Sequence, residues 1–376
     1  MTVAEERSLE PLVGGNARRF FALAQRCTWG VSQPDLVRVD VPATLDQLER
    51  EFPRCFASYL VRAFAEAKSR PEHATEAYAR AEALCSVDHP WRYLLADAPD
   101  WTKAPPEPGL VEVHETGLYR VHGYTWLEGT PFHIASTMTI VRLSGGELAL
   151  INPGPVSQAL LAAIQGLGAV RYLITQGRGH NRYLESSRAH FPQAELLGTH
   201  GHTQHPRSAH VRFDGLLGTP SAQLPSELMA FPVEGTKADE VVLLHRPSRT
   251  LIFQDLVANN LPANTARGFG GRVYYLSHGL AARIGIASYN VVLWDDLRGF
   301  QRGLQAIVAA DFERVTGAHW PLALSAGAEV SAFRQTLSWA SGLSAWQHKS
   351  MVARYLAGQP GFLIDLVRYS LASRSR

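Results

Sequence analysis

Apolar residues recur at helical spacing along the first hundred positions. From position 45 to 64 they return every three or four residues, which is the spacing of one buried helix face. Pro53 interrupts this run and predicts that the helix is kinked or split there. A second helix is expected over 72–85, directly after Pro71. We therefore expect residues 1–96 to form a helical region.

The period changes from helical to strand-like after a proline-rich segment. Residues 97–110 hold four prolines, a composition typical of a linker. Short β-rich runs then alternate with helical runs, an order that predicts an α/β domain over 111–343. An amphipathic helical tail is expected over 344–376. The expected strands are 118–124, 137–143, 147–151, 170–175, 194–198, 241–245, 250–254 and 314–317, and the expected helices are 158–167, 183–190 and 291–310.

Composition narrows the class of protein. The chain has 376 residues, of which 46% are hydrophobic and 19% charged, as in ordinary globular proteins. Its 36 basic and 34 acidic residues lack the basic excess typical of nucleic-acid-binding proteins, so we expect no nucleic-acid partner. The three cysteines are too few for a disulfide framework. With a charged start and no long apolar run, the sequence indicates a cytoplasmic protein without a transmembrane segment.

Several expected strands end in polar motifs, the position where α/β proteins build their sites. The motifs are Asn152-Pro153-Gly154 after strand 147–151, the segment Gln176-Gly177-Arg178-Gly179-His180-Asn181 after strand 170–175, Asp255 after strand 250–254, and His319 after strand 314–317.

The order of these motifs resembles the metallo-β-lactamase fold over residues 110–330. The resemblance implies an αββα sandwich, here with an N-terminal helical extension. In that superfamily a His-x-His-x-Asp-His loop holds metal, followed by an aspartate and a late histidine. The four loop positions here are Gln176, Arg178, His180 and Asn181, of which only His180 is a good ligand. The resemblance therefore implies an eroded metal site of His180, Asp255 and His319.

A further stretch narrows the resemblance to one branch of the fold. Residues 245–251 read His-Arg-Pro-Ser-Arg-Thr-Leu, and residues 191–194 read Phe-Pro-Gln-Ala. Both are similar to a divergent, uncharacterised branch whose members lack the full metal set and to which no reaction is assigned. The resemblance therefore indicates no substrate.

Two histidines and one carboxylate have the composition of a mononuclear metal site. Catalytic zinc takes about three protein ligands and keeps one position open, and the same set suits non-haem iron. The resemblance implies a hydrolase in which the metal lowers the pKa of a water nucleophile to about 7. His180 and His319 would be ligands, and Asp255 a ligand and candidate base. The expected cofactor is zinc or iron, and the substrate an unidentified small molecule.

Arg178 supports an alternative without metal. A guanidinium stays protonated, so beside Asp255 it would replace the charge of the ion. The protein would then be a non-catalytic binding or scaffolding protein, whose helical extension serves a protein partner. The sequence leaves both hypotheses open, and with them whether the chain is an enzyme. In either case Gln176 and Asn181 would line the site.

A second histidine cluster competes with segment 176–181. His200, His202 and His205 have the spacing of a metal loop. Strands 170–175 and 194–198 are separated by one helix and are expected to be parallel, which would bring His200 and His202 to the same cleft. The interpretation we favour is a solvated loop.

Two other segments are candidates for lesser roles. His245 ends one strand of a hairpin between arginines, where it would contact a substrate or, the interpretation we favour, stabilise the turn. The glycine-rich segment 268–272 is expected to form a mobile lid over the cleft.

Overall fold

The computed structural model describes residues 16–32, 39–89, 92–95, 109–127, 130–259, 268–278, 280, 284–286, 290, 293–320 and 328–357. Most of the predicted linker at 97–110 and the predicted tail beyond 357 lie outside these residues.

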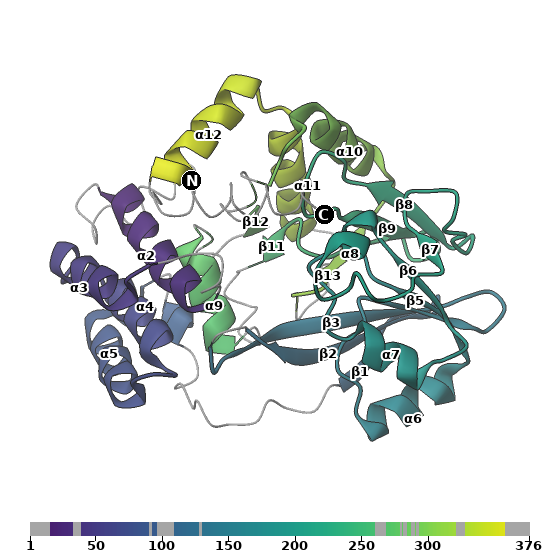
Figure 1. The fold of residues 1–376 in the computed structure, drawn as a ribbon, viewed down its shortest axis with the longest axis horizontal. Coiled ribbons are helices and arrows are strands. Elements are labelled where there is room, and N and C mark those ends of the chain that lie inside the picture. The colour runs from purple at the N-terminus through teal and green to yellow at the C-terminus, as the bar shows by residue number, and fades with distance from the viewer. Residues whose placement is uncertain are drawn as a thin grey trace.

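The N-terminal region is helical, as predicted (Figure 1). The run over 45–64 is split at Pro53, because a proline cannot donate the backbone hydrogen bond that would continue the helix. Asp40 caps the first of the two resulting helices by accepting a hydrogen bond from Ala43 N. The elements are α2 (Ala17–Ser32), α3 (Val41–Glu51), α4 (Phe56–Glu66), α5 (Pro71–Leu84) and η1 (Arg92–Leu95).

Helix α9 (Gly268–Ser277) packs into the core of these N-terminal helices. Phe269 and Val273 are buried there, and Ser277 Oγ lies 2.9 Å from Thr28 Oγ1 of α2. A Cβ at Gly270 would lie 2.4 Å from the Cβ of Phe132, so close backbone approach requires glycine there. The expectation of a mobile lid over 268–272 is therefore wrong, because the segment begins a buried helix.

Two β-sheets pack face to face in the remainder of the described chain (Figure 1). Buried residues of both sheets, such as Ile151 and Leu243, share one core between them. The first sheet has the order β1 (Gly109–His114), β2 (Leu118–Trp126), β3 (His133–Arg142), β4 (Leu148–Ile151), β5 (Val170–Ile174), β6 (Glu195–Gly198) and β7 (Gly215–Leu216). The second has the order β13 (Arg314–Gly317), β10 (Thr250–Phe253), β9 (Val241–His245) and β8 (Leu228–Pro232), and β11 (Ala258–Asn259) pairs with β12 (Ile284–Gly285).

Helices cover the outer face of each sheet. Helices α6 (Gln158–Leu167) and α7 (Leu184–His190) bury apolar residues against the first sheet. Helices α10 (Leu297–Ala309), α11 (Ala328–Ser341) and α12 (Ala345–Ala357) do so beside the second. The predicted αββα sandwich with an N-terminal helical extension is thus confirmed.

Parallel pairing brings the polar strand ends together at one edge. Strands β4, β5 and β6 are parallel, as predicted for the last two. In the second sheet β10 is parallel to β13, with Phe253 opposite Gly317. The residues that follow these strands therefore meet at the same edge of the sandwich.

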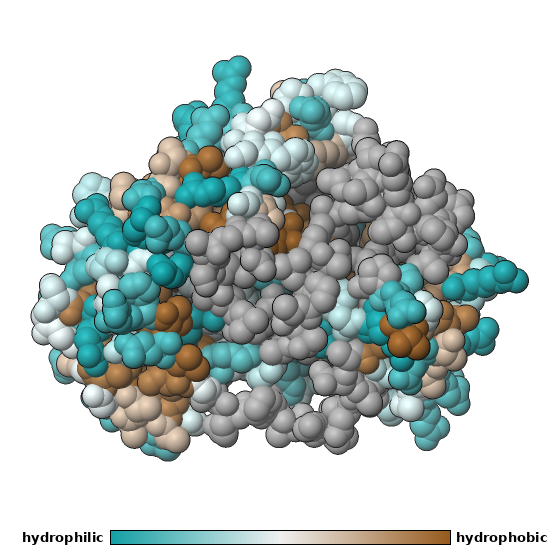
Figure 2. All heavy atoms as spheres, turned by 180° about the vertical axis from the view of Figure 1, so that it is seen from behind, coloured by the Kyte–Doolittle hydropathy of each residue, from teal (hydrophilic) through white to brown (hydrophobic). Residues whose placement is uncertain are grey.

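The surface shows no single apolar face on the side opposite to Figure 1. Hydrophilic and hydrophobic residues are interspersed there wherever the residues are coloured (Figure 2). None of the described helices has both the length and the hydropathy needed to cross a membrane.

Candidate functional site

Three side chains converge where the two sheets meet. His180 Nε2 lies 3.1 Å from His319 Nε2. Asp255 Oδ1 lies 3.8 Å from His180 Nε2 and 3.3 Å from His319 Nε2. Within the described part of the chain, this is the cluster of metal-binding residue types whose ligand atoms all lie within 4.8 Å of one another. The structure therefore brings together the three residues predicted as ligands.

Each histidine is held by its own loop after a strand. The loop after β5 closes with a hydrogen bond from His180 N to Gly177 O, and Thr175 Oγ1 donates to His180 O at 2.8 Å. His319 follows β13, and its Nδ1 donates to Ala135 O at 2.7 Å. That bond fixes the orientation of the His319 ring, so that its Nε2 faces the cluster.

Glu240 binds the backbone at Asp255 through two hydrogen bonds. Its two carboxylate oxygens accept hydrogen bonds from Gln254 N at 2.7 Å and from Asp255 N at 3.0 Å. Glu240 is buried, which together with the charge of Asp255 raises the pKa of Glu240 to about 8. We did not predict this residue, whose only signal was its place directly before the apolar strand β9.

The electrostatics of the cluster keep its carboxylate ionised. Burial lowers the pKa of His180 against the opposing effect of the charge of Asp255. Burial acts to raise the pKa of Asp255, but the charges and hydrogen bonds of His180 and His319 outweigh it and hold that pKa well below its usual value. Asp255 is therefore ionised at neutral pH and supplies a negatively charged ligand atom.

The cluster fits a tetrahedral metal ion in donor type and spacing. A tetrahedral ion with bonds of about 2.1 Å separates its ligand atoms by about 3.4 Å. The three observed separations of 3.1, 3.3 and 3.8 Å lie around that value. The hydrogen bond from His319 to Ala135 O is the type of outer contact that orients ligating histidines.

Gln176 is part of the structural core beneath the site. It is fully buried, and its Nε2 donates to Val241 O at 2.8 Å and to Ile252 O at 2.7 Å. Its Oε1 accepts from Asn152 Nδ2 at 2.7 Å. These bonds occupy its amide and join the two sheets. Gln176 is therefore a structural residue, contrary to the expectation that it lines the site.

Arg178 and Asn181 have hydrogen-bond partners outside the cluster. Arg178 Nη1 donates to Lys237 O at 3.4 Å. Asn181 Nδ2 donates to Arg178 O at 2.9 Å and lies 3.1 Å from His205 Nδ1. Among the described residues, the ion pairs of Asp255 are with His180 and His319. The ion pair between Arg178 and Asp255, which the metal-free alternative required, is therefore not among the ion pairs of the described residues.

The second histidine cluster does not form a joint cleft site. His202 is fully buried in α8 (His200–Gln204), where its Nδ1 accepts from Thr199 N at 3.1 Å and caps the helix. His200 is exposed and lies 2.8 Å from Gln204 Nε2 of the same helix. The idea that His200 and His202 share the cleft is wrong, because one points into the core and the other bonds locally.

His245 lies at the far end of the second sheet. It pairs with Thr250 at the start of β10, whereas Asp255 follows the end of that strand. Its Nδ1 lies 2.7 Å from Ser248 Oγ in the turn. The favoured interpretation of a hydrogen-bonded turn residue agrees with this contact, and a substrate contact does not.

Comparison with solved structures finds metallo-β-lactamases. DIM-1 metallo-β-lactamase exposed to ceftazidime is 14% identical, with 64% of this chain and 100% of that chain covered and a TM-score of 0.45. The metallo-β-lactamase from Pontibacter korlensis is 14% identical over 63% of this chain and 100% of that chain, with a TM-score of 0.43. FIM-1 from Pseudomonas aeruginosa in its mono-zinc form is 11% identical over 63% of this chain and 97% of that chain, with a TM-score of 0.42.

These structures bear the family name that the sequence motifs indicated. No protein-family model matches the chain, and no curated protein does. At such low identities the likeness concerns the fold alone, and the TM-scores lie below 0.5. The chain's own residues are therefore the basis for assigning a function.

Proposed function

We propose that the protein is a metal-dependent hydrolase with one metal ion held by His180, Asp255 and His319. The observation that supports this most directly is the convergence of three ligand atoms at separations of 3.1 to 3.8 Å. Two imidazoles and one carboxylate match the ligands that zinc and iron take. With three protein ligands, a fourth position stays open for water or substrate.

A bound zinc or iron ion would supply Lewis acidity and lower the pKa of a water molecule to about 7. The chain's own residues would do the rest. His319 presents Nε2 because Ala135 O holds the opposite nitrogen. Asp255 offers Oδ1 to the cluster, while its Oδ2 accepts a hydrogen bond from Gln254 Nε2 at 3.2 Å. That hydrogen bond helps to orient the carboxylate, so that Oδ1 lies beside the two histidines.

The metal-free alternative loses its specific support. It required Arg178 to neutralise Asp255, and Arg178 instead donates to Lys237 O. Two histidines remain beside Asp255, and a histidine pair gives a full positive charge only on protonation. The side chains around Asp255 are therefore better suited to binding a cation than to replacing one.

Elemental analysis of untagged protein tests the proposal. We expect about one zinc or iron per chain, lost in His180→Ala and in His319→Ala, as removal of one of three ligands predicts. The matched control is His200→Ala, which removes an exposed imidazole from α8. Absence of metal from every sample, even after incubation with zinc, would overturn the proposal.

A further inference from the structure

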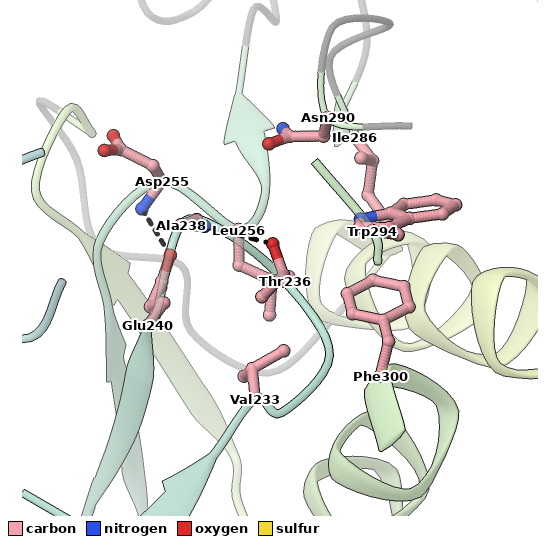
Figure 3. Close-up of a pocket in the computed structure, with 10 residues that line it drawn as sticks. All are labelled: Val233, Thr236, Ala238, Glu240, Asp255, Leu256, Ile286, Asn290, Trp294 and Phe300. Atoms are coloured by element: carbon pink, nitrogen blue, oxygen red, sulfur yellow. Dashed lines mark hydrogen bonds between the residues drawn. The ribbon is translucent and has the colours of Figure 1, made fainter. Parts of the chain in front are cut away.

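Hydrogen bonds to buried groups hold the backbone at two of the candidate metal ligands. Glu240 accepts a hydrogen bond from Asp255 N, which Figure 3 shows as a dashed line. The backbone of His180 is held in a comparable way, since its carbonyl oxygen accepts a hydrogen bond of 2.8 Å from Thr175 Oγ1. Thr175 is fully buried at the end of β5. The position of His180 therefore depends on what fixes the hydroxyl group of Thr175.

A second buried side chain, His202 of α8, lies directly behind that hydroxyl group. Its ring is fully buried beside Phe213, and its Nε2 lies 3.3 Å from Thr175 Oγ1. Its Nδ1 accepts a hydrogen bond of 3.1 Å from Thr199 N. A ring nitrogen that accepts a hydrogen bond carries no proton, so the proton of this imidazole is on Nε2. His202 Nε2 therefore donates to Thr175 Oγ1, because the hydroxyl proton is already donated to His180 O.

Helix α8 also contacts the loop over 176–181 at two further points. His205, directly after the helix, has its Nδ1 at 3.1 Å from Asn181 Nδ2, which also donates to Arg178 O. A Cβ at Gly201 would lie 3.0 Å from the Cβ of Arg178, so helix and loop approach each other closely there. The histidine-rich segment thus packs against the loop that carries a candidate ligand.

We propose that His202 is a positioning residue for the candidate metal ligand His180, acting through the hydroxyl group of Thr175. This inference rests on the proposed function, because it concerns the same metal ion. Thr199 N, His202, Thr175 and His180 O form one continuous chain of hydrogen bonds. Outer contacts that orient ligating residues are worth about 10- to 100-fold in metal affinity. His202 therefore contributes to zinc binding without contacting the ion.

Two substitutions of His202 separate this role from the capping of α8. Asparagine keeps an acceptor near the position of Nδ1 but has no donor at the position of Nε2, whereas glutamine offers a donor there. In calorimetric zinc titration we expect His202→Asn to bind about 10-fold more weakly than the parent protein, and His202→Gln to recover most of that loss. His200→Ala, at an exposed histidine of the same helix, is the matched control and should bind zinc as the parent does.

Urea unfolding of the same variants shows what a purely structural role would do. Each substitution removes one hydrogen bond of a buried side chain, so both should lower the free energy of unfolding. If His202 only stabilised the fold, the zinc affinities of His202→Asn and His202→Gln would be equal. Equal affinities in these two variants would therefore overturn the inference.

Thr175→Val tests the same chain of bonds without changing the histidine. Because valine has nearly the shape of threonine, this variant tests the inference even where His202→Asn fails to fold. It should weaken zinc binding about 10-fold, and adding His202→Asn should weaken it no further, because both changes break one chain of bonds. Parent-like zinc affinity in Thr175→Val, or losses that add in the double variant, would overturn the inference. Failure of the parent protein to bind zinc would instead overturn the proposed function, so the two failures are distinguishable.

Discussion

His180 Nε2 and His319 Nε2 lie 3.1 Å apart although 139 residues separate them in the chain. The first follows β5 of one sheet and the second follows β13 of the other. Both nitrogens face the carboxylate of Asp255. This meeting of ligand atoms across two sheets defines the candidate metal centre.

Asp255→Asn should abolish tight metal binding without unfolding the protein. The change removes the single negative charge of the cluster and keeps its shape. Outer contacts of ligands are worth about 10- to 100-fold in metal affinity, so loss of a ligand charge should weaken zinc binding by more than about 100-fold. Calorimetric zinc titration measures this. Asp295→Asn, at an exposed aspartate before α10, is the control and should bind zinc as the parent does.

Glu240→Gln should affect both stability and metal binding. Glu240 accepts hydrogen bonds from Gln254 N and Asp255 N. In glutamine one of the two accepting oxygens is replaced by an NH2 group, which would face a backbone N–H and leave it without an acceptor. An unpaired buried group costs about 1–3 kcal/mol in the free energy of unfolding. Because Asp255 would shift, zinc affinity should also fall about 10- to 100-fold.

Urea unfolding and zinc titration measure the two effects of Glu240→Gln separately. Glu234→Gln, at an exposed residue that pairs with Arg302 at 3.4 Å, is the matched control and should change both quantities little. Parent-like zinc affinity in Glu240→Gln would show that Glu240 does not position Asp255.

Gln176→Leu should destabilise the sandwich while leaving the metal ligands in place. The change leaves Val241 O, Ile252 O and Asn152 Nδ2 without their partner in the core. With about 1–3 kcal/mol for each such group, the free energy of unfolding should fall by about 3 kcal/mol or more. Urea unfolding against Gln193→Leu checks this, and a loss below about 1 kcal/mol would contradict the role of Gln176 as a link between the sheets.

Arg178→Ala separates the two hypotheses drawn from the sequence. If Arg178 neutralised a buried Asp255, its removal would cost about 3–5 kcal/mol. Because the ion pairs of Asp255 among the described residues are with His180 and His319, we expect a loss below that range. A thermal or urea unfolding curve decides between these values, and the larger loss would return the metal-free hypothesis.

Acidification should destabilise the protein through histidines that are buried in the neutral form. Burial lowers the pKa of His245 to about 4, and the same holds for His202 and His278. Between an unfolded pKa of about 6.5 and that value, the unfolded chain binds more protons than the folded one. This stabilisation is therefore complete above about pH 6.5 and is lost as the pH falls toward 4, by up to about 3 kcal/mol for each group.

Unfolding free energies at pH 7 and pH 5 measure this loss. His245→Gln should flatten the pH dependence, whereas His200→Ala, at an exposed histidine, should leave its slope unchanged. Equal slopes in the parent and in His245→Gln would show that His245 does not contribute.

Much of the sandwich and the ligand cluster could be predicted from the sequence. Strands such as 170–174 and 250–253 are short apolar runs, and parallel strands bring their ends to one edge. His180, Asp255 and His319 each follow such a strand, and the resemblance of the motif order to the metallo-β-lactamase fold grouped them.

The roles of the remaining residues depend on whether their side chains are buried, which the spacing of residues in the sequence does not show. His202 has the spacing of a ligand but lies in the core, where it caps its own helix. Glu240 precedes a strand, a position that is usually exposed for an acid, and is buried because it holds two backbone N–H groups. The packing of α9 on the N-terminal helices depends on contacts with Thr28 and Phe132, far away in sequence.

Cobalt(II) titration of metal-free protein tests the central claim most directly. Cobalt takes the place of zinc and absorbs visible light according to its ligands and geometry. We predict one cobalt per chain with a tetrahedral-type spectrum, abolished in both His180→Ala and His319→Ala and retained in His200→Ala. Absence of such a spectrum in the parent protein, or its persistence in the two cluster variants, would contradict a metal site formed by His180, Asp255 and His319.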